Sequence, residues 1–294
     1  MLKSYWKKFW YLFINTIYVC LHPISRNAIF LNGWINCSCG KIRRRNFGDE
    51  LNVYLLEKLV SQPVVIYKSW FHRSRTNYMM IGSLIDGFTD SKSIVWGSGI
   101  ISDKSPLIAK PQKVCAVRGK ITRDYLCHNG VECPEIYGDP ALLAPYVYQP
   151  DVDKKYTIGV IPHISDFHDV VVEKFVADNK DDVCLIDFAN YDDWHDVIDK
   201  ICSCRYIISS SLHGLILSDA YGIPNLWIRI SDRVKGGDCK FLDYFSGVNR
   251  KTKSAFVMDE DTDLSDIMEA IADYECINYD VKPLLKSCPF NLNL

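Results

Sequence analysis

The sequence of 294 residues has no strong excess of either charge, because 34 lysines and arginines stand against 36 aspartates and glutamates. The formal net charge of -2 gives no overall attraction to nucleic acid, and no basic tract dominates the chain. Internal repeats and low-complexity tracts are lacking as well. An anionic ligand would therefore have to be held by local groups rather than by an overall field.

The sequence also lacks an apolar run that is long enough to span a bilayer comfortably. The candidate at residues 9–21 is short and contains Asn15 and Thr16, and no small-x-small cleavage site follows it. Its apolar residues nevertheless recur at helical spacing, with lysines nearby: Trp6, Trp10, Phe13, Ile17 and Leu21, beside Lys3, Lys7 and Lys8. We expect segment 1–25 to form a helix that either lies in a membrane interface or packs on the protein surface. The expected location is cytoplasmic, and peripheral at the inner membrane face if the helix binds lipid.

The 12 cysteines do not follow a disulfide or zinc pattern. The chain is long and 48% apolar, unlike a small secreted domain that depends on disulfides. The two CxC pairs, Cys37/Cys39 and Cys202/Cys204, lack a matched second half with a histidine partner. This pattern favours thiols in a reducing compartment over a metal site.

Strand-like and helix-like segments alternate through the rest of the chain in two series. The first has strands expected at 27–35, 63–68, 78–85, 93–99 and 113–119, and helices at 49–60 and 121–130. The second has strands expected at 156–163, 183–189, 205–211 and 224–230, and helices at 168–179, 192–204, 212–222, 239–247 and 263–276. A polar break at 149–156 separates the two series.

Such alternation is typical of parallel sheets with right-handed crossovers. We therefore predict an α/β protein with two Rossmann-like domains that face a cleft, an N-terminal one at 26–150 and a C-terminal one at 151–294. Ligands of such folds bind beyond the carboxyl ends of the strands.

One such strand end carries the segment SSSLHG, in which Ser210, Ser211 and His213 lie between an expected strand and an expected helix. Hydroxyls and free N–H groups at a helix N-terminus can bind an anion, and a histidine there can donate a hydrogen bond or transfer a proton. The alternative is that the serines cap the helix and His213 is a core residue.

Two more strand ends carry basic or titratable side chains. Arg118 follows the apolar strand VCAV, and its planar guanidinium suits phosphate or carboxylate. His163 ends the strand YTIGVIP and is aimed at the cleft, although a capping role would also explain it.

Three loops add small and polar residues at the ends of elements: Asn46, Gly48 and Asp49; Gly97, Ser98 and Gly99; and Asp139. Glycine lets a backbone approach a ligand, and an aspartate can cap a helix or bind a sugar hydroxyl. The GxG at 97–99 lacks the rest of the dinucleotide fingerprint, and Asp139 lies in a turn signature.

In order, the segments NFGDELN, VWGSGI, AVRGKIT, YGDPALL, IGVIPH, SSSLHGLILSDAYGIP and GDCKFLDYFSG resemble the polysaccharide pyruvyl transferase family. The resemblance runs from about Asn46 to Gly247. It implies a two-domain fold like that of GT-B glycosyltransferases, phosphoenolpyruvate as the donor, and a saccharide acceptor that is often lipid-linked. It places Arg118, Leu212 and His213 at donor-site positions.

The expected activity is transfer of a pyruvyl group from phosphoenolpyruvate to a pair of sugar hydroxyls, which forms a ketal in capsule or exopolysaccharide biosynthesis. His213 would protonate C3 of the donor or assist the leaving phosphate. Arg118 would hold the donor's charge, helped by Ser210 and Ser211 at the helix N-terminus. Asp49 or Asp139 would orient or deprotonate an acceptor hydroxyl. Phosphoenolpyruvate enters as a co-substrate, and the mechanism requires no metal or other cofactor.

Two other functions remain open at this point. One is a nucleotide-sugar glycosyltransferase on the same fold, in which SSSLHG would bind the diphosphate. The other is a non-catalytic glycan-binding or membrane-scaffold protein, which would release no phosphate.

Overall fold

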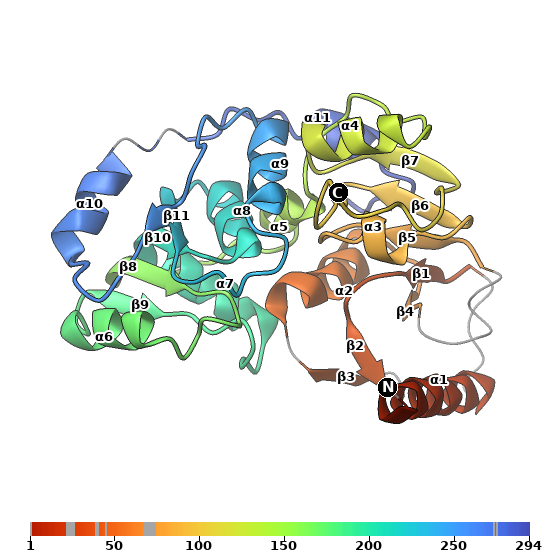
Figure 1. The fold of residues 1–294 in the computed structure, drawn as a ribbon, viewed down its shortest axis with the longest axis horizontal. Helices are drawn as coiled ribbons and strands as arrows, with labels where there is room; N and C mark the ends of the chain where they lie inside the picture. The colour runs from red at the N-terminus through yellow and green to blue at the C-terminus, as the bar shows by residue number, and fades with distance from the viewer. Residues whose placement is uncertain are drawn as a thin grey trace.

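The computed structural model describes residues 2–21, 27–38, 41–44, 46–67, 75–272, 274 and 276–294. Two five-stranded parallel sheets lie side by side in this structure (Figure 1). The first has the strand order β4-β1-β5-β6-β7, and the second has the order β12-β11-β10-β8-β9. This is a Rossmann-like α/β architecture with two parallel sheets flanked by helices, as predicted.

The strands of the first sheet are β1 (Ile29–Leu31), β4 (Val64–Ile66), β5 (Asn77–Met79), β6 (Ser93–Trp96) and β7 (Lys113–Ala116). Those of the second are β8 (Tyr156–Ile161), β9 (Val183–Leu185), β10 (Cys204–Ser209), β11 (Asn225–Arg229) and β12 (Phe256–Val257). A small antiparallel pair, β2 (Asn36–Ser38) and β3 (Lys41–Arg44), stands outside both sheets. Most strand residues are apolar and more than half are buried, as is typical of parallel strands that are covered on both faces.

The helices before the polar break are α1 (Leu2–Leu21), α2 (Phe47–Leu59), α3 (Ile85–Phe88), α4 (Lys120–His128), the 3-10 turn η2 (Pro140–Leu143) and α5 (Ala144–Val147). Those after it are α6 (Val170–Asp178), α7 (Trp194–Cys202), α8 (Leu212–Ala220), α9 (Cys239–Gly247), α10 (Leu264–Ala272) and α11 (Lys282–Lys286). The nine strands and seven helices expected from the two series are confirmed, with bounds that differ by up to six residues; the largest difference is at the expected strand 78–85, which ends at Met79 and whose last residue, Ile85, begins α3. Gly130, with φ +67, follows α4 as an αL terminator.

The sequence pattern did not indicate the short elements. The β2–β3 pair, α3, η2, α5 and β12 are two to four residues long, too short for a hydrophobic period to stand out. The C-terminal tail also contains the short helix α11.

The C-terminal tail packs against the first sheet rather than the second. The indole Nε1 of Trp96 donates to the carbonyl of Leu284 (3.0 Å), and the backbone N–H of Asn293 donates to the carbonyl of Leu59 (2.7 Å). The predicted domain ranges 26–150 and 151–294 stay a prediction, since the two series of strands share one tail and one continuous core cluster.

Further contacts join the first series of strands and helices to the second. The N–H of Phe47 donates to the carbonyl of Phe188 (2.8 Å), and the N–H of Lys120 donates to Ser246 Oγ (2.9 Å). Helix α9 packs on α4, so a helix from the end of the chain lies against the first half. Residues from both halves therefore line the same region at the strand ends.

The N-terminal segment forms the helix α1, as expected, at one edge of the molecule beside β2 (Figure 1). Asn15 is buried on its inner side, and its Nδ2 donates to the carbonyl of Cys37. The five apolar side chains that set the helical spacing are exposed, from 37% at Phe13 to 71% at Leu21. No described helix has the length and the apolar character needed to cross a membrane.

Candidate functional site

The serines between β10 and α8 hold the backbone of this junction together. Ser209 Oγ accepts a hydrogen bond from the N–H of Ser211 (3.0 Å), and Ser210 Oγ accepts one from the N–H of His163 (2.8 Å). The second bond ties the end of β8 to the end of β10. Ser211 is the N-cap residue of α8, but its side chain makes no capping bond. Leu212, predicted at the donor site, buries its side chain in the core.

His213 lies in the first turn of α8 and faces the first half of the molecule. Its ring packs against Gly48, so closely that a Cβ at Gly48 would lie 2.0 Å from the histidine Nδ1. Its Nε2 is buried and has no hydrogen-bond partner among the described residues. Burial, then the positive charges of Lys240 and Arg118, lower the pKa of His213 to about 3. The unliganded site therefore holds a neutral imidazole at pH 7.

The loop before α2 supplies the surface that meets His213. Asn46 Nδ2 donates to Asp49 Oδ2 (2.6 Å), and the N–H of Asn46 donates to Glu50 Oε1 (2.8 Å), which resembles one half of a capping box. Gly48 is buried, and only a residue without a side chain fits beneath the imidazole. The predicted residue Gly48 thus lies against His213, and the charge of Asp49 acts to raise the pKa of Lys240.

Arg118 lies near this group, but its guanidinium already has partners. The side chain is fully buried: Nε donates to Asp243 Oδ2 (2.9 Å), Nη1 to Ser83 Oγ (2.6 Å) and Nη2 to the carbonyl of Ile100 (2.8 Å). A Cβ at Gly99 would lie 2.3 Å from the guanidinium carbon. Arg118 follows strand β7, as expected. Its side chain is fully buried, and its ion pair with Asp243 joins the two halves of the protein.

The other two predicted loops pack around Arg118 in the first half. Gly97 has φ +86 and lies against Pro140, and Ser98 Oγ donates to the carbonyl of Gly82 (2.8 Å). Asp139 is fully buried; its Oδ1 caps η2 by accepting from the N–H of Ala141 (2.9 Å), and its Oδ2 has no partner among the described residues. Burial raises the pKa of Asp139 to about 7, although Arg118 opposes the shift.

Lys240, in the first turn of α9, is a site residue to which the sequence analysis gave no role. Its side chain is buried, with 8% of the residue exposed, and its Nζ makes no hydrogen bond or ion pair with any described residue. The ammonium lies 5.3 Å from the centre of the Phe241 ring. Burial and Arg118 lower the pKa of Lys240 to about 8, against the opposing effect of Asp49 and Asp166. The sequence did hold a signal for Lys240, because it is the lysine of GDCKFLDYFSG, one of the segments that resemble the family.

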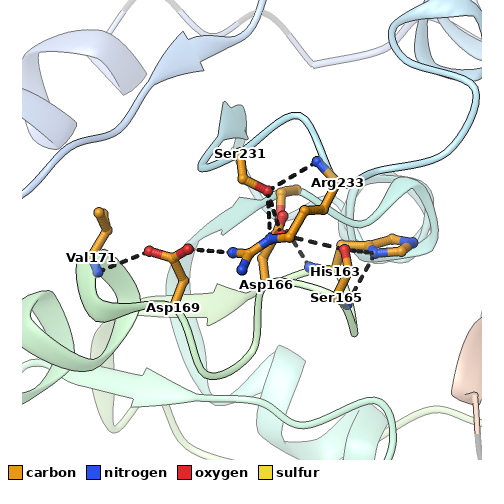
Figure 2. Close-up of polar contacts among 8 residues, drawn as sticks. His163, Ser165, Asp166, Asp169, Val171, Ser231 and Arg233 are labelled. Carbon is orange, nitrogen blue, oxygen red and sulfur yellow. Dashed lines mark hydrogen bonds and ion pairs between the residues drawn. The ribbon is translucent and has the colours of Figure 1, made fainter.

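His163 lies at the rim of a polar network that fixes two loops of the second half (Figure 2). Its Nδ1 is bonded to Ser165 Oγ (2.7 Å). Asp166 Oδ1 accepts from Ser231 Oγ (2.7 Å) and from Arg233 Nε (3.1 Å), and Arg233 also pairs with Asp169. Burial, followed by Lys240, lowers the pKa of His163 to about 4.

The network of Figure 2 links the loop after β8 to the loop after β11. The second of these loops lines a cavity of about 270 Å³ at the carboxyl ends of β10 and β11. Ser210 and Phe241 contribute to its wall, whereas His213 and Lys240 lie outside the lining. The cavity therefore adjoins the group of titratable side chains without containing it.

The predicted site residues thus fall into two groups. Gly48 contacts His213, the charge of Lys240 lowers the pKa of His163 and His213, and the charge of Asp49 raises the pKa of Lys240. Gly97, Ser98, Gly99 and Asp139 pack around the paired Arg118. The described residues contain no group of three His, Cys, Asp or Glu that could hold a metal ion, and the described cysteines are free thiols.

Two parallel sheets flanked by helices, with His213 and Lys240 in the first turns of α8 and α9, define a Rossmann-like α/β protein. The sequence model of the family described as polysaccharide pyruvyl transferase matches residues 1–232. The chain therefore belongs to the polysaccharide pyruvyl transferase family, and the resemblance found in the sequence is confirmed. This membership indicates a pyruvyltransferase of polysaccharide biosynthesis.

A curated relative is a protein of Acanthamoeba polyphaga mimivirus that is described as uncharacterized protein L143. It is 30% identical over 216 residues, which cover 70% of this chain and 72% of that protein.

Proposed function

We propose that this protein transfers a pyruvyl group from phosphoenolpyruvate to two hydroxyls of a saccharide, on a lipid-linked precursor, and so forms a pyruvate ketal. The observation that carries the proposal is the buried Nε2 of His213, which lies at the start of α8 and has no partner among the described residues, in a member of this family. Lys240 supplies positive charge nearby. A donor with a phosphate and a carboxylate matches these groups in charge.

The reaction needs one proton at C3 of the donor, which turns C2 into an oxocarbenium-like centre. One hydroxyl adds to C2, phosphate departs with its bonding electron pair, and the second hydroxyl closes the ketal. The two hydroxyls release two protons, one to replace that delivered to C3 and one for the phosphate. Acid–base groups beside the donor therefore serve both the protonation of C3 and the deprotonation of the hydroxyls.

His213 is suited to exchange these protons once the donor is bound. In the unliganded protein its pKa is about 3, because burial and two cations disfavour the imidazolium. A bound trianion would offset the two cations and raise this pKa toward the ordinary value of about 6.5. Nε2 has no competing partner among the described residues, so it is available to the substrate.

The direct test is phosphate release from phosphoenolpyruvate with a panel of lipid-linked and synthetic glycosides. We expect His213→Gln to lower kcat by about 10²- to 10⁴-fold, the usual contribution of general acid–base catalysis. His128→Gln is the matched control, because His128 is exposed at the end of α4. Equal rates for wild type and His213→Gln would remove His213 from the mechanism.

The remaining predicted residues take supporting roles in this proposal. Asp49 orients or deprotonates an acceptor hydroxyl, and the N–H of Leu212 at the start of α8 faces the donor. The two halves act as GT-B-like domains, 26–150 and 151–294, with the substrate between them at the carboxyl ends of the strands. In this proposal the acceptor saccharide enters through the cavity beside Ser210.

A nucleotide-sugar glycosyltransferase is the alternative, and the family match does not favour it. Thermal stabilisation by phosphoenolpyruvate, but not by UDP- or GDP-sugars, would separate the two activities. A non-catalytic glycan-binding protein would release no phosphate under any condition.

We also propose that α1 lies at the cytoplasmic face of a membrane, where lipid-linked acceptors reside. Its exposed Trp6, Trp10 and Leu21 form part of an apolar surface, and the sequence of α1 contains lysines but no acidic residue. Aromatic rings and basic residues are typical of interfacial helices. Co-sedimentation should increase from neutral to anionic vesicles and fall when Trp6 and Trp10 are both replaced by serine. Undiminished binding of that variant would contradict the proposal.

A further inference from the structure

The cavity at the carboxyl ends of β10 and β11 lies outside the group of titratable side chains that includes His213. Its lining comes from Ser210 directly after β10, from β11 and the loop that follows it, and from Phe241 in α9. Ligands of parallel α/β folds bind at this edge of the sheet. The volume of about 270 Å³ lies just below the range of about 300–1,000 Å³ that is usual for small-molecule sites. The cavity therefore suits one small ring rather than an extended chain.

Hydrogen bonds hold the loop after β11 in place around this cavity (Figure 2). Ser231 Oγ, which lines the cavity, donates to Asp166 Oδ1 (2.7 Å), and Arg233 Nε donates to the same oxygen (3.1 Å). Arg233 also pairs with Asp169, which caps α6 by accepting from the N–H of Val171. The cavity is therefore formed before a ligand arrives, and such preorganisation lowers the cost of binding.

One side of the cavity offers hydrogen-bond donors and acceptors next to each other. Arg229 at the end of β11 pairs with Asp238, and the two side chains are 39% and 41% exposed, so a ligand can reach both. Asp238 is the N-cap residue of α9, but its side chain makes no capping bond. A guanidinium donates hydrogen bonds and a carboxylate accepts them, whereas a hydroxyl can do either. The pair therefore matches two neighbouring hydroxyls of a sugar ring.

The rest of the lining limits the class of ligand. Trp227 stacks on Phe241 with the ring centres 4.6 Å apart, and both residues contribute an apolar wall that suits the C–H groups of a sugar. Among the described residues of the lining, one is basic, Arg229, and two are acidic, Asp232 and Asp238. A nucleotide diphosphate would meet these carboxylates as like charges, which is unfavourable. A neutral saccharide meets no such repulsion.

We infer that this cavity is a saccharide subsite, which binds a neutral sugar unit of the acceptor next to the unit that receives the pyruvyl group. Arg229 and Asp238 recognise two neighbouring hydroxyls of the bound unit. Ser210 lies just before α8, and Phe241 follows Lys240, so the cavity adjoins the residues proposed for the chemistry without including them. The identification of this saccharide as the acceptor rests on the proposed function, whereas its binding in the cavity does not.

The test is binding of neutral glycosides to the full chain without phosphoenolpyruvate, measured by saturation-transfer-difference NMR. The probes are the methyl glycosides of glucose, galactose, mannose and N-acetylglucosamine and disaccharides built from them, with UDP-glucose and GDP-mannose as charged probes. We expect neutral disaccharides to bind the wild type, and Arg229→Met and Asp238→Ala each to raise their Kd by about tenfold, since each removes a hydrogen bond to a charged group. Glu135→Ala is the matched control, because it removes an exposed ion pair with Arg123 in the first half and should leave Kd unchanged.

Each outcome decides a separate point. Absence of binding of every neutral glycoside to the wild type, preferential binding of the nucleotide sugars, or a Kd that neither variant changes overturns the inference. The first two comparisons need no variant, so they cover the case in which Arg229→Met or Asp238→Ala does not fold. Binding that depends on Arg229 and Asp238, without phosphate release from phosphoenolpyruvate with any acceptor, retains the inference and removes the proposed function. Phosphate release with the same acceptor KM in wild type and both variants would retain the function and remove the subsite.

Discussion

Arg118 and Lys240 are two buried cations at the same junction of the two halves, and their surroundings differ. Arg118 comes from the strand end after β7 and has a carboxylate and two further acceptors. Lys240 comes from α9 and has no acceptor among the described residues. In the folded protein the guanidinium of Arg118 has hydrogen-bond acceptors, whereas the ammonium of Lys240 has none among the described residues. The difference teaches that an arginine at a strand end can join two halves of a protein, while a less conspicuous lysine is left for a ligand.

A second lesson concerns glycine at the same junction. Gly48 and Gly99 each allow a ring or a guanidinium to occupy the space where a Cβ would stand. Gly99 faces the paired Arg118, and Gly48 faces His213, whose Nε2 has no partner among the described residues. Glycine therefore makes room for a buried structural arginine at position 99 and for the histidine of the candidate site at position 48.

The largest effect on folding should follow the loss of Arg118. Arg118→Met leaves the Asp243 carboxylate buried without its counter-charge, so the free energy of unfolding should fall by about 3–5 kcal/mol. Urea denaturation measures this loss. Asp243→Asn in the same chain removes the unpaired charge and keeps an acceptor for Thr122, so the double variant should regain part of the stability. A loss below about 1 kcal/mol would show that the pair contributes little.

The next effect concerns the fit of Gly48 beneath His213. Gly48→Ala places a Cβ 2.0 Å from Nδ1, so the imidazole has to move; stability should fall by about 1–3 kcal/mol and turnover at least tenfold. Gly87→Ala is the matched control, because a Cβ at Gly87 meets no atom within 4 Å. Comparable turnover in the two variants would show that the position of His213 is not critical.

A smaller effect is the response of stability to acid. The folded pKa of His213, about 3, lies below the unfolded value of about 6.5, so the unfolded chain binds the extra proton between these values. The stability is therefore complete above pH 6.5 and declines as the pH falls toward 3. His213→Gln should reduce this slope by up to about 1.4 kcal/mol per pH unit. Urea midpoints from pH 4 to 7 measure it, and parallel curves for wild type and variant would contradict the burial of a neutral imidazole.

The sequence predicted the sheets and the main helices because their apolar residues repeat with a clear period over several turns or strands. It also predicted that His213, Gly48 and His163 lie at strand or helix ends, which a parallel fold brings to one edge. The partner of Arg118 could not be inferred, because Asp243 is 125 residues away and only the packing of α9 on α4 brings it there. Lys240 was overlooked for the same reason, since its isolation is a property of the folded surroundings.

The most direct test of the account compares the free energies of unfolding of wild type and Lys240→Met, with and without saturating phosphoenolpyruvate. Because Lys240 makes no ion pair or hydrogen bond with a described residue, Lys240→Met should be at least as stable as the wild type without ligand, and phosphoenolpyruvate should stabilise it less. A variant that is less stable without ligand, yet gains as much from phosphoenolpyruvate as the wild type, would contradict the claim that Lys240 is left for the donor.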